Sequence, residues 1–283
     1  MPLKEFTFLD VYRRNAEFFP DRTAFVFEGQ RITHREYLKR VERLAAGLAR
    51  EGVKSGDRVA ILSQNSLEMI DVIGAVARLG AILLPVNFRL NAEEIGYVLA
   101  DGAPVLVVAG AEYQEIIAAL KPSLPSVRSY FGIGKHTAPF APLANLAASD
   151  ASMSDVNFSA DDGFVIIHTA AVGGRPRGAL LSQANLLTAH SSLVQAWSLT
   201  ERDVNLGVLP LFHVAGLGLM LTVQQAGGAS VIASKFDPQQ AVCDIAAERV
   251  TVMSEFAPML AGLMDQAKGD ELKTLRAVTG LDT

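Results

Sequence analysis

The sequence has a single cysteine, Cys243, and little net charge, since 25 Lys and Arg residues stand against 30 Asp and Glu residues among 283. One thiol cannot form a disulfide within the chain, so we expect a reducing compartment and a cytoplasmic protein. Cys243 is expected to be buried and inert, because free cysteine behaves as a small hydrophobic residue. The lack of excess positive charge argues against a protein that binds nucleic acid through the phosphate backbone.

Hydrophobic runs long enough to cross a membrane are also lacking, although half of the residues are hydrophobic. The two most apolar stretches, Ile70–Val86 and Val208–Val223, both contain proline and polar residues, and both are predicted to be buried elements. The first ten residues have no apolar core before a small-residue cleavage site, so no secretion signal is expected there. The composition excludes a disordered chain and indicates a globular protein of one large or two modest domains.

Predicted helices and strands alternate from Thr33 onward. Thr33 and Glu36 form a capping-box pattern at the start of a helix, and Asn91 with Glu94 repeats it. Buried strands are predicted at 58–62, 81–84 and 105–108, with a helix at 67–79 that ends at a glycine. This order is typical of an α/β fold in which mostly parallel strands are covered by helices on both faces.

The pattern loosens between residues 121 and 162, where four prolines and a small polar run indicate a connection between two lobes. A second α/β series follows, with strands at 164–167, 206–209, 230–233 and 275–279 and helices at 183–197, 214–225, 238–249 and 258–266. We therefore expect residues 1–160 to form the first lobe and its connection, and residues 161–283 to form the second. Because the chain stops directly after a predicted strand, we expect it to be a fragment.

The stretch from His168 to Gly178 lies between a predicted strand and a helix opened by Ser182. Its small residues would allow backbone N–H groups to approach an anion, and Arg175 and Arg177 add positive charge. It has neither the Gly-Lys-Ser/Thr ending of a Walker loop nor the glycine pattern of a dinucleotide-binding turn. From these residues alone, a phosphate-binding loop and a plain strand–helix connection both stay open.

The same stretch resembles the signature loop of the adenylate-forming enzymes, which include acyl-CoA synthetases, peptide-synthetase adenylation domains and luciferases. The residues at matching positions are Thr169, Gly174, Pro176, Gly178, Ser182 and Asn185. Pro210–Leu217 is similar to the segment beside the family's acyl pocket, and Leu275–Gly280 to the strand before its Gly-Gly-Ala loop. Gly56–Ile61 and Gly80–Asn87 are similar to its first lobe. Within the family, the acyl-CoA synthetase branch fits best.

The resemblance implies an α/β fold of two stacked, mostly parallel sheet lobes with helices packed between and around them. It implies ATP-dependent activation of a carboxylic acid, most closely a fatty acid, to an acyl-adenylate, followed by transfer to coenzyme A with Mg²⁺ as a further cofactor. These small molecules are the expected partners; neither nucleic acid nor a transmembrane segment is expected, and a homodimer is left open. The main catalytic residues, the remaining lobe and the C-terminal domain would lie beyond Thr283, so we expect this chain to be inactive alone.

Site residues follow from the resemblance by position. Those implied to bind the ATP phosphates are Thr169, Ala170, Ala171, Val172, Gly173, Gly174 and Arg177. Those implied to line the acyl-substrate pocket are His213, Val214, Gly216 and Gly280, and no metal ligand is implied in this chain. Without that context, a lone histidine at the start of an apolar helix is more often a core residue. The small residues after His213 are predicted to open a slot for the acyl chain, and His190 is expected to be solvated.

Several positions depart from the family pattern. Residues 170–173 replace Ser-Gly-Thr-Thr, so two or three hydroxyl donors to phosphate are missing from the loop. Arg177 replaces a lysine, and arginine binds phosphate at two points with a different reach. Gln183 replaces a histidine. A non-catalytic or decayed module that acts in binding or dimerisation therefore stays open as the alternative function.

Overall fold

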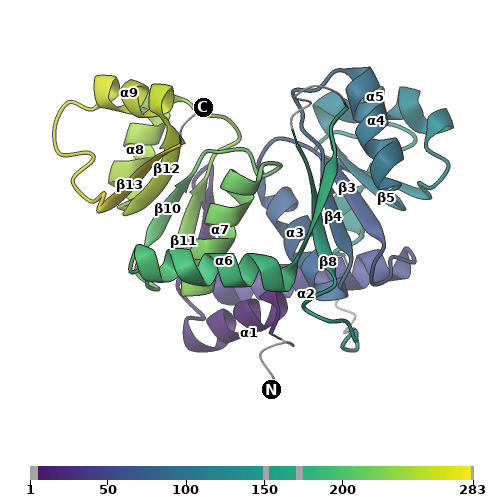
Figure 1. Cartoon of the computed structure of the whole chain (residues 1–283), viewed down its shortest axis with the longest axis horizontal. Helices are drawn as coiled ribbons and strands as arrows, with labels where there is room; N and C mark the ends of the chain where they lie inside the picture. The colour runs from purple at the N-terminus through teal and green to yellow at the C-terminus, as the bar shows by residue number, and fades with distance from the viewer. Residues whose placement is uncertain (1–5, 149–152, 170–174, 282–283) are drawn as a thin grey trace. The chain divides into compact units, whose positions relative to one another are not determined.

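The structure, a computed structural model, describes residues 6–148, 153–169 and 175–281. The chain divides into two compact units: unit 1 comprises Met1–Asp10 and Leu38–Leu186, and unit 2 comprises Val11–Tyr37 and Leu187–Thr283. Each unit has its own sheet (Figure 1). Helices α1 (Phe8–Phe18), α2 (His34–Arg50) and α6 (Gln183–Ala196) contain residues of both units. The predicted α/β class with mostly parallel strands is confirmed.

Unit 1 is built on a seven-stranded sheet. Its strands are β3 (Arg58–Leu62), β4 (Ile82–Pro85), β5 (Leu106–Gly110), β6 (Ser129–Ile133), β7 (Ala141–Pro142), β8 (Gly163–His168) and β9 (Gly178–Ser182). Its other helices are α3 (Leu67–Leu79), α4 (Ala92–Gly102), α5 (Gln114–Leu120) and the short η2 (Ala111–Tyr113), η3 (Lys121–Ser123) and η4 (Leu143–Asn145). The strand order is β7-β6-β5-β3-β4-β8-β9, and every pair is parallel except β8 and β9. Helices α4 and α5 pack on one face, and α3 covers the other (Figure 1).

Local signals account for the helices of unit 1. The Ser66 side chain caps α3 by accepting a hydrogen bond from the N–H of Met69, and Gly80 ends that helix in the left-handed conformation with φ 64°. Asn91 and Glu94 form a reciprocal capping box at the start of α4. These caps satisfy N–H groups that the first helical turn leaves without a partner. The predicted starts of both helices are confirmed.

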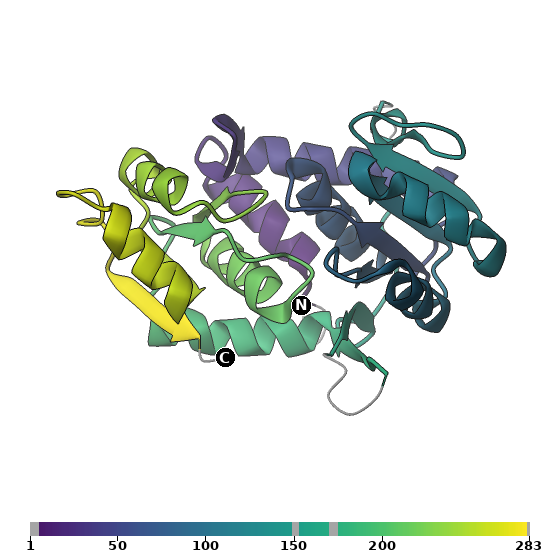
Figure 2. The same ribbon diagram turned by 90° about the horizontal axis from the view of Figure 1, so that it is seen from above.

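The sheet of unit 2 has six strands. They are β1 (Thr23–Phe27), β2 (Gln30–Thr33), β10 (Val204–Gly207), β11 (Ala229–Ile232), β12 (Val252–Phe256) and β13 (Ala277–Leu281). Their order is β13-β12-β10-β11-β1-β2, and every pair is parallel except β1 and β2. Helices α8 (Pro238–Glu248) and α9 (Ala257–Gln266) pack on one face, and α6 and α7 (Val214–Ala226) on the other. Figure 2 shows β13 at the edge of this sheet, beside α9.

The placement of β8 and β9 differs from the expected division of the chain at residue 160. Val165 of β8 is in register with Leu83 of β4, so β8 extends the sheet of unit 1 by one parallel strand. Strand β9 then returns antiparallel, with Gly178 in register with His168. The N-terminal strands β1 and β2 instead belong to the sheet of unit 2. A strand's own pattern indicates that it is buried, and it does not specify the neighbour with which it pairs.

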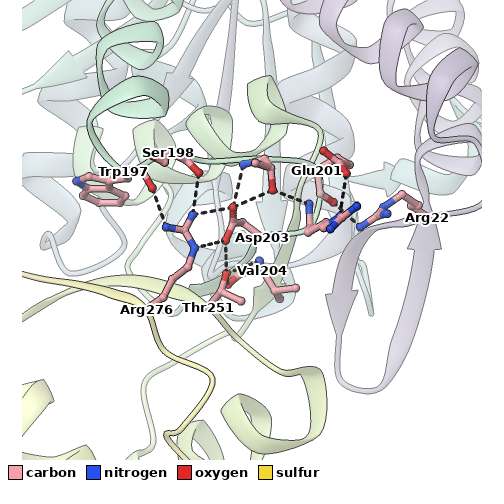
Figure 3. Close-up of polar contacts among 10 residues, drawn as sticks. Arg22, Trp197, Ser198, Glu201, Asp203, Val204, Thr251 and Arg276 are labelled. Carbon is pink, nitrogen blue, oxygen red and sulfur yellow. Dashed lines mark hydrogen bonds and ion pairs between the residues drawn. The ribbon is translucent and has the colours of Figure 1, made fainter.

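A half-buried ion pair between Arg276 and Asp203 holds the edge strand β13 in unit 2 (Figure 3). The Arg276 guanidinium donates to both carboxylate oxygens of Asp203, at 2.8 and 2.7 Å, and to the carbonyl oxygens of Trp197 and Ser198. The Thr251 hydroxyl donates to the same carboxylate at 2.7 Å. Burial alone would raise the pKa of Asp203, but these hydrogen bonds outweigh it and lower the pKa below its ordinary value. The cluster therefore fixes the start of β13 against the strands beside it.

Cys243 is exposed on α8, so the expectation of a buried thiol is wrong. The apolar side of α8 is formed instead by Ala241, Val242 and Ile245, which leaves the position of Cys243 toward solvent. No helix in the described part of the chain is long and apolar enough to cross a bilayer.

Candidate functional site

The predicted phosphate loop joins β8 to β9 in unit 1, at the carboxyl end of β8. In open α/β sheets, ligands bind beyond the carboxyl ends of the strands. Residues Ala170, Ala171, Val172, Gly173 and Gly174 lie outside the described residues. The flanks of the loop are described, and they include the predicted residues Thr169 and Arg177.

The two flanks of the loop are hydrogen-bonded to each other. The N–H of Thr169 donates to the carbonyl oxygen of Arg177 at 3.0 Å, and the N–H of Arg177 donates to Oγ1 of Thr169 at 3.4 Å. The structure thus brings these two predicted residues together.

Two guanidinium groups lie on the same flank. Both Arg175 and Arg177 are exposed, and the Arg175 guanidinium lies 5.3 Å from the centre of the Tyr97 ring of α4. No carboxylate among the described residues forms an ion pair with either arginine. The flank therefore offers two exposed cationic forks that can bind an oxyanion.

Directly before the loop, the sequence analysis missed a histidine–carboxylate pair. Nε2–H of His168 donates to Oδ2 of Asp101 on α4 at 3.0 Å, and the His168 side chain is only 8% exposed. Its other ring nitrogen, Nδ1, is buried and has no hydrogen-bond partner among the residues that the structure describes. A Cβ on the opposite residue, Gly178, would lie 2.7 Å from Cγ2 of Ile166 and 3.3 Å from the His168 ring, so the glycine leaves room for both side chains. The histidine is visible in the sequence beside the loop, but nothing local predicts its partner 67 residues earlier.

The segment after the loop is held by polar side chains. Ser182 and Asn185 cap the start of α6 reciprocally, each accepting from the other's backbone N–H at 3.1 Å. Gln183, which stands where the resembling family has a histidine, is buried; its amide accepts from the N–H of Phe8 at 2.8 Å and donates to the carbonyl oxygen of Ala77 at 3.2 Å. Gln183 therefore ties together three segments of unit 1, and no ligand is needed to explain it.

The predicted acyl segment lies in unit 2, where α7 follows β10. His213 is the N-cap residue of α7, its side chain makes no capping hydrogen bond, and its ring centre lies 4.5 Å from that of Phe212. His213 is exposed, and Val214 is 50% exposed although it is apolar. Both lie at the carboxyl end of the sheet, as a ligand-binding role requires.

The glycines of α7 do not open the slot predicted from the sequence. A Cβ on Gly216 would lie 2.5 Å from the carbonyl oxygen of Pro210 and 2.8 Å from that of Leu209, so backbone fills the space. A Cβ on Gly218 would lie 3.5 Å from Nε2 of His190, which occupies that side of the helix. His190 is 3% exposed, so the expectation of a solvated histidine is wrong, and its burial lowers its pKa to about 4.

Gly280 lies on β13, and β12 separates it from β10 and the His213 turn in the sheet. Its register partner on β12 is Glu255, whose side chain is fully buried; neither carboxyl oxygen has a hydrogen-bond partner in the described part of the chain. Burial raises the pKa of Glu255 to about 8, so this carboxyl group keeps its proton at neutral pH. Neither Glu255 nor its strand was predicted from the sequence.

A cavity of about 350 Å³ opens in unit 1 away from all of these residues. It is lined by charged side chains of α2 and α3, among them Arg40 and Asp71, which form a bidentate ion pair with each other. None of the predicted site residues lines it.

In the described ranges, no three His, Cys, Asp or Glu side chains gather closely enough to hold a metal ion. The flanks of the loop thus present donors suited to an anion.

Comparisons with known proteins find matches along most of the chain. A model of the family described as AMP-binding enzyme matches residues 12–281. A feruloyl-CoA synthase from Amycolatopsis sp is 32% identical over 241 residues, which cover 85% of this chain and 46% of that protein. The chain therefore spans about half the length of the curated relatives it matches.

Among solved structures, this chain is similar to a protein of Rhodopseudomonas palustris CGA009 assigned as a long-chain-fatty-acid CoA ligase. The TM-score is 0.96 at 67% identity, covering 99% of this chain and 70% of that chain. It is also similar to ATP-bound MatB from Rhodopseudomonas palustris, with a TM-score of 0.82 at 28% identity, covering 95% of this chain and 54% of that one.

Proposed function

This chain belongs to the AMP-binding enzyme family, and from that premise we propose that it carries the ATP-binding and acid-binding parts of an acid–thiol ligase. The proposed ligase converts a carboxylic acid to an acyl-adenylate with ATP and then transfers the acyl group to coenzyme A. The relatives named above as CoA synthase and CoA ligase support this reaction class.

The proposed chemistry explains why a phosphate site is needed. A carboxylate resists acyl transfer because its charge is delocalised and oxide is a poor leaving group. When a carboxylate oxygen attacks the α-phosphorus of ATP, the bond to pyrophosphate breaks and the acyl group gains AMP as a leaving group. A thiol then attacks the acyl carbon and releases AMP. Negative charge grows on the departing pyrophosphate, so fixed cationic donors, and Mg²⁺ when it is bound, would stabilise that step.

The observation that carries the proposal is the closed base of the loop between Thr169 and Arg177, with two exposed guanidinium groups on its flank. We assign the β- and γ-phosphates of ATP to this loop. Thr169 would offer its hydroxyl group and Arg177 its guanidinium, and the backbone of Ala170–Gly174 is assigned by resemblance. Because the loop's sequence lacks hydroxyl side chains at those five positions, backbone N–H groups and arginine would hold most of the negative charge.

The acid is proposed to bind in unit 2. His213 and Val214 are exposed at the start of α7, and a Cβ on Gly280 would meet no described atom within 4 Å. Packing among the described residues therefore fills none of these three positions. Gly216 would shape this end of the site by allowing the first turn of α7 to lie against the backbone of Leu209 and Pro210.

A fatty acid is the proposed substrate. Its support is the 67% identity with the Rhodopseudomonas palustris protein assigned as a long-chain-fatty-acid CoA ligase. The name of the 32% identical feruloyl-CoA synthase instead indicates an aromatic acid for that protein. Binding of a long-chain fatty acid and of ferulic acid to the same preparation, measured by calorimetry, would distinguish the two substrates.

The phosphate assignment is tested by Arg177→Ala. Loss of one charge-assisted hydrogen bond should cost about 1.5–3 kcal/mol, which weakens ATP binding about 10- to 150-fold and leaves fatty-acid binding unchanged. Arg202→Ala is the matched control, because Arg202 is also exposed but precedes the amino end of β10. Equal ATP affinity for Arg177→Ala and the parent chain would refute the assignment.

We also propose that this chain alone does not form acyl-adenylates, since it spans about half of its curated relatives. Pyrophosphate release that depends on both ATP and a fatty acid, at a rate of order 1 s⁻¹ or faster, would refute this. The alternative, a non-catalytic binding or dimerisation module, is favoured by the missing hydroxyl groups of residues 170–173. It predicts no ATP binding, together with a concentration-dependent dimer in light scattering.

A further inference from the structure

A second cavity of unit 1, of about 480 Å³, lies between the last turn of α2, the start of β6 and the segment 139–146. Strands β3, β4, β5, β6 and β8 are parallel, so the start of β6 lies at the opposite edge of the sheet from the loop that follows β8. None of the described residues assigned above to ATP or to the acid lines this cavity. Its volume is within the range of about 300–1,000 Å³ that small-molecule sites occupy.

Positive charge predominates in the wall of this cavity. Its cationic side chains are those of Arg50, Lys121 and Arg128, and its carboxylate is that of Glu51. All four residues are exposed. The Glu51 carboxylate accepts a hydrogen bond from the hydroxyl group of Ser129 at 2.8 Å. The wall therefore carries an excess of two positive charges, which favours an anionic ligand.

Contacts within the fold account for only part of what the two arginines can do. Arg50 donates to the carbonyl oxygen of Leu146 at 3.0 Å, and Arg128 donates to that of Gly52 at 3.3 Å. The Arg128 guanidinium also lies 3.7 Å from the carboxylate of Asp57. Because a guanidinium has five N–H donors and each of these hydrogen bonds uses one, both side chains keep donors for a ligand.

The third cation, Lys121, is not placed by any carboxylate. No acidic side chain in the described ranges forms an ion pair with it. Its Nζ lies instead 5.4 Å from the centre of the Tyr130 ring, which also lines the cavity and packs edge-on against Phe140. A cation–π contact at an exposed site is weak, so an anion would compete for the ammonium group. Tyr130 is 6% exposed, and its ring would report such a movement of Lys121.

We propose that this cavity binds a small organic molecule that carries a phosphate group, held by Arg50, Lys121 and Arg128. A phosphate monoester has three terminal oxygens and up to two negative charges, so it can satisfy three separate cationic donors. A carboxylate has two oxygens and one charge, and it would leave one of the three cations unpaired. The carbon skeleton of the ligand would contact the apolar part of the wall, at Val127 and Pro139. The proposal is independent of the proposed function, because it uses none of the same residues.

The test uses this chain with phenyl phosphate as the probe and with phenol as the matched compound that lacks the phosphate. Calorimetry at neutral pH and low ionic strength gives the Kd. Ring ¹³C spectra of tyrosine-labelled protein locate the probe, and Tyr130→Phe identifies the Tyr130 signals. The charge variants are Lys121→Gln and Arg128→Gln. Lys54→Gln is the matched control, since Lys54 is an exposed lysine of the same unit that does not line the cavity.

We expect phenyl phosphate to bind with a Kd of about 1 mM or below and to shift the Tyr130 ring signals. Lys121→Gln and Arg128→Gln should each raise this Kd about three- to tenfold, because each removes one exposed, charge-assisted contact. Added salt should weaken binding. Phenol should not bind, and Lys54→Gln and Arg177→Ala should bind phenyl phosphate like the parent. Circular dichroism melts establish that each variant is folded.

The proposal is overturned if phenyl phosphate leaves the Tyr130 signals unchanged, or if phenol binds as tightly as phenyl phosphate. It is also overturned if Lys54→Gln weakens binding as much as Lys121→Gln does, since the effect would then be one of net charge. Binding that is lost in Arg177→Ala and kept in Lys121→Gln would place the probe at the loop after β8, so this proposal would fail and the proposed function would stand. Absence of ATP binding by the parent, with phenyl phosphate binding as expected, would refute the proposed function alone.

Discussion

Two glycines of one helix, Gly216 and Gly218 of α7, should respond oppositely to the same substitution. A methyl group on Gly216 would lie 2.5 Å from the carbonyl oxygen of Pro210, a backbone atom that cannot rotate away. A methyl group on Gly218 would lie 3.5 Å from Nε2 of His190, which is ordinary contact. We therefore expect Gly216→Ala to destabilise the protein and Gly218→Ala to stabilise it.

The magnitudes follow from two opposing contributions. Alanine favours a helix over glycine by about 1 kcal/mol, and this gain is common to both variants. Inserting a methyl group into filled space costs about 1–3 kcal/mol, and the upper part of that range applies where backbone must move. The net free energy of unfolding should therefore fall by about 1–2 kcal/mol for Gly216→Ala and rise by about 0.5–1 kcal/mol for Gly218→Ala.

Urea unfolding followed by circular dichroism measures both changes. If the slope of the unfolding free energy against urea concentration is unchanged, the unfolded states of the variants are comparable. Gly216→Leu should be poorly folded for the same reason. If the slot predicted from the sequence existed, this variant would fold and would only bind shorter fatty acids than the parent. A Gly216→Ala protein as stable as the parent would refute the steric argument and restore the slot.

The remaining predictions concern buried or exposed single groups. Glu255→Gln should gain stability relative to the parent as pH rises from 4.5 through about 8, because the folded parent holds the protonated acid and unfolding releases that proton. With the pKa of Glu255 raised to about 8, the gain in the free energy of unfolding approaches about 3–5 kcal/mol at pH 8.5, measured by urea titration. A stability difference that stays constant across this pH range would contradict the prediction. Asp203→Asn should lower the free energy of unfolding by about 2–3 kcal/mol, less than for a fully buried pair, because Arg276 is 40% exposed. This loss should shrink as pH falls through the lowered pKa of Asp203, and thermal melts at pH 7 and at a series of lower pH values check both statements. Cys243 should react with a thiol reagent in the folded protein about as fast as in urea, and a thiol protected by the fold would contradict its exposed position.

Helix positions were predictable because their signals are local. The capping pair Asn91 and Glu94, and Ser66 with Gly80, lie within a few residues of the helix ends that they determine. Sheet membership was not predictable in the same way. The pattern of β8 indicates a buried strand, but its pairing with β4 depends on residues about eighty positions earlier. Strand β12 was missed because Ser254 and Glu255 interrupt its apolar pattern, although both are buried.

The candidate site likewise contains residues that the sequence identifies and residues whose role depends on contacts far along the chain. Thr169 and Arg177 could be identified by position in a resembling motif, and the structure brings them together. The role of Gly216 could not be identified from the sequence. A side chain there is excluded by the carbonyl oxygens of Leu209 and Pro210, and the sequence does not predict that the backbone of these residues turns back against α7. His190 was misassigned for a related reason: its neighbours on α6 are polar, but α7 covers its own side of the helix.

The composition of the phosphate loop determines how the loop would hold phosphate. Hydroxyl groups stabilise phosphate through neutral hydrogen bonds, whereas arginine does so through charge, which is stronger per contact and falls with salt. The sequence between Thr169 and Arg175 has no hydroxyl side chain, and the two arginines Arg175 and Arg177 follow it. Phosphate affinity would therefore depend on ionic strength more steeply here than in a hydroxyl-rich loop.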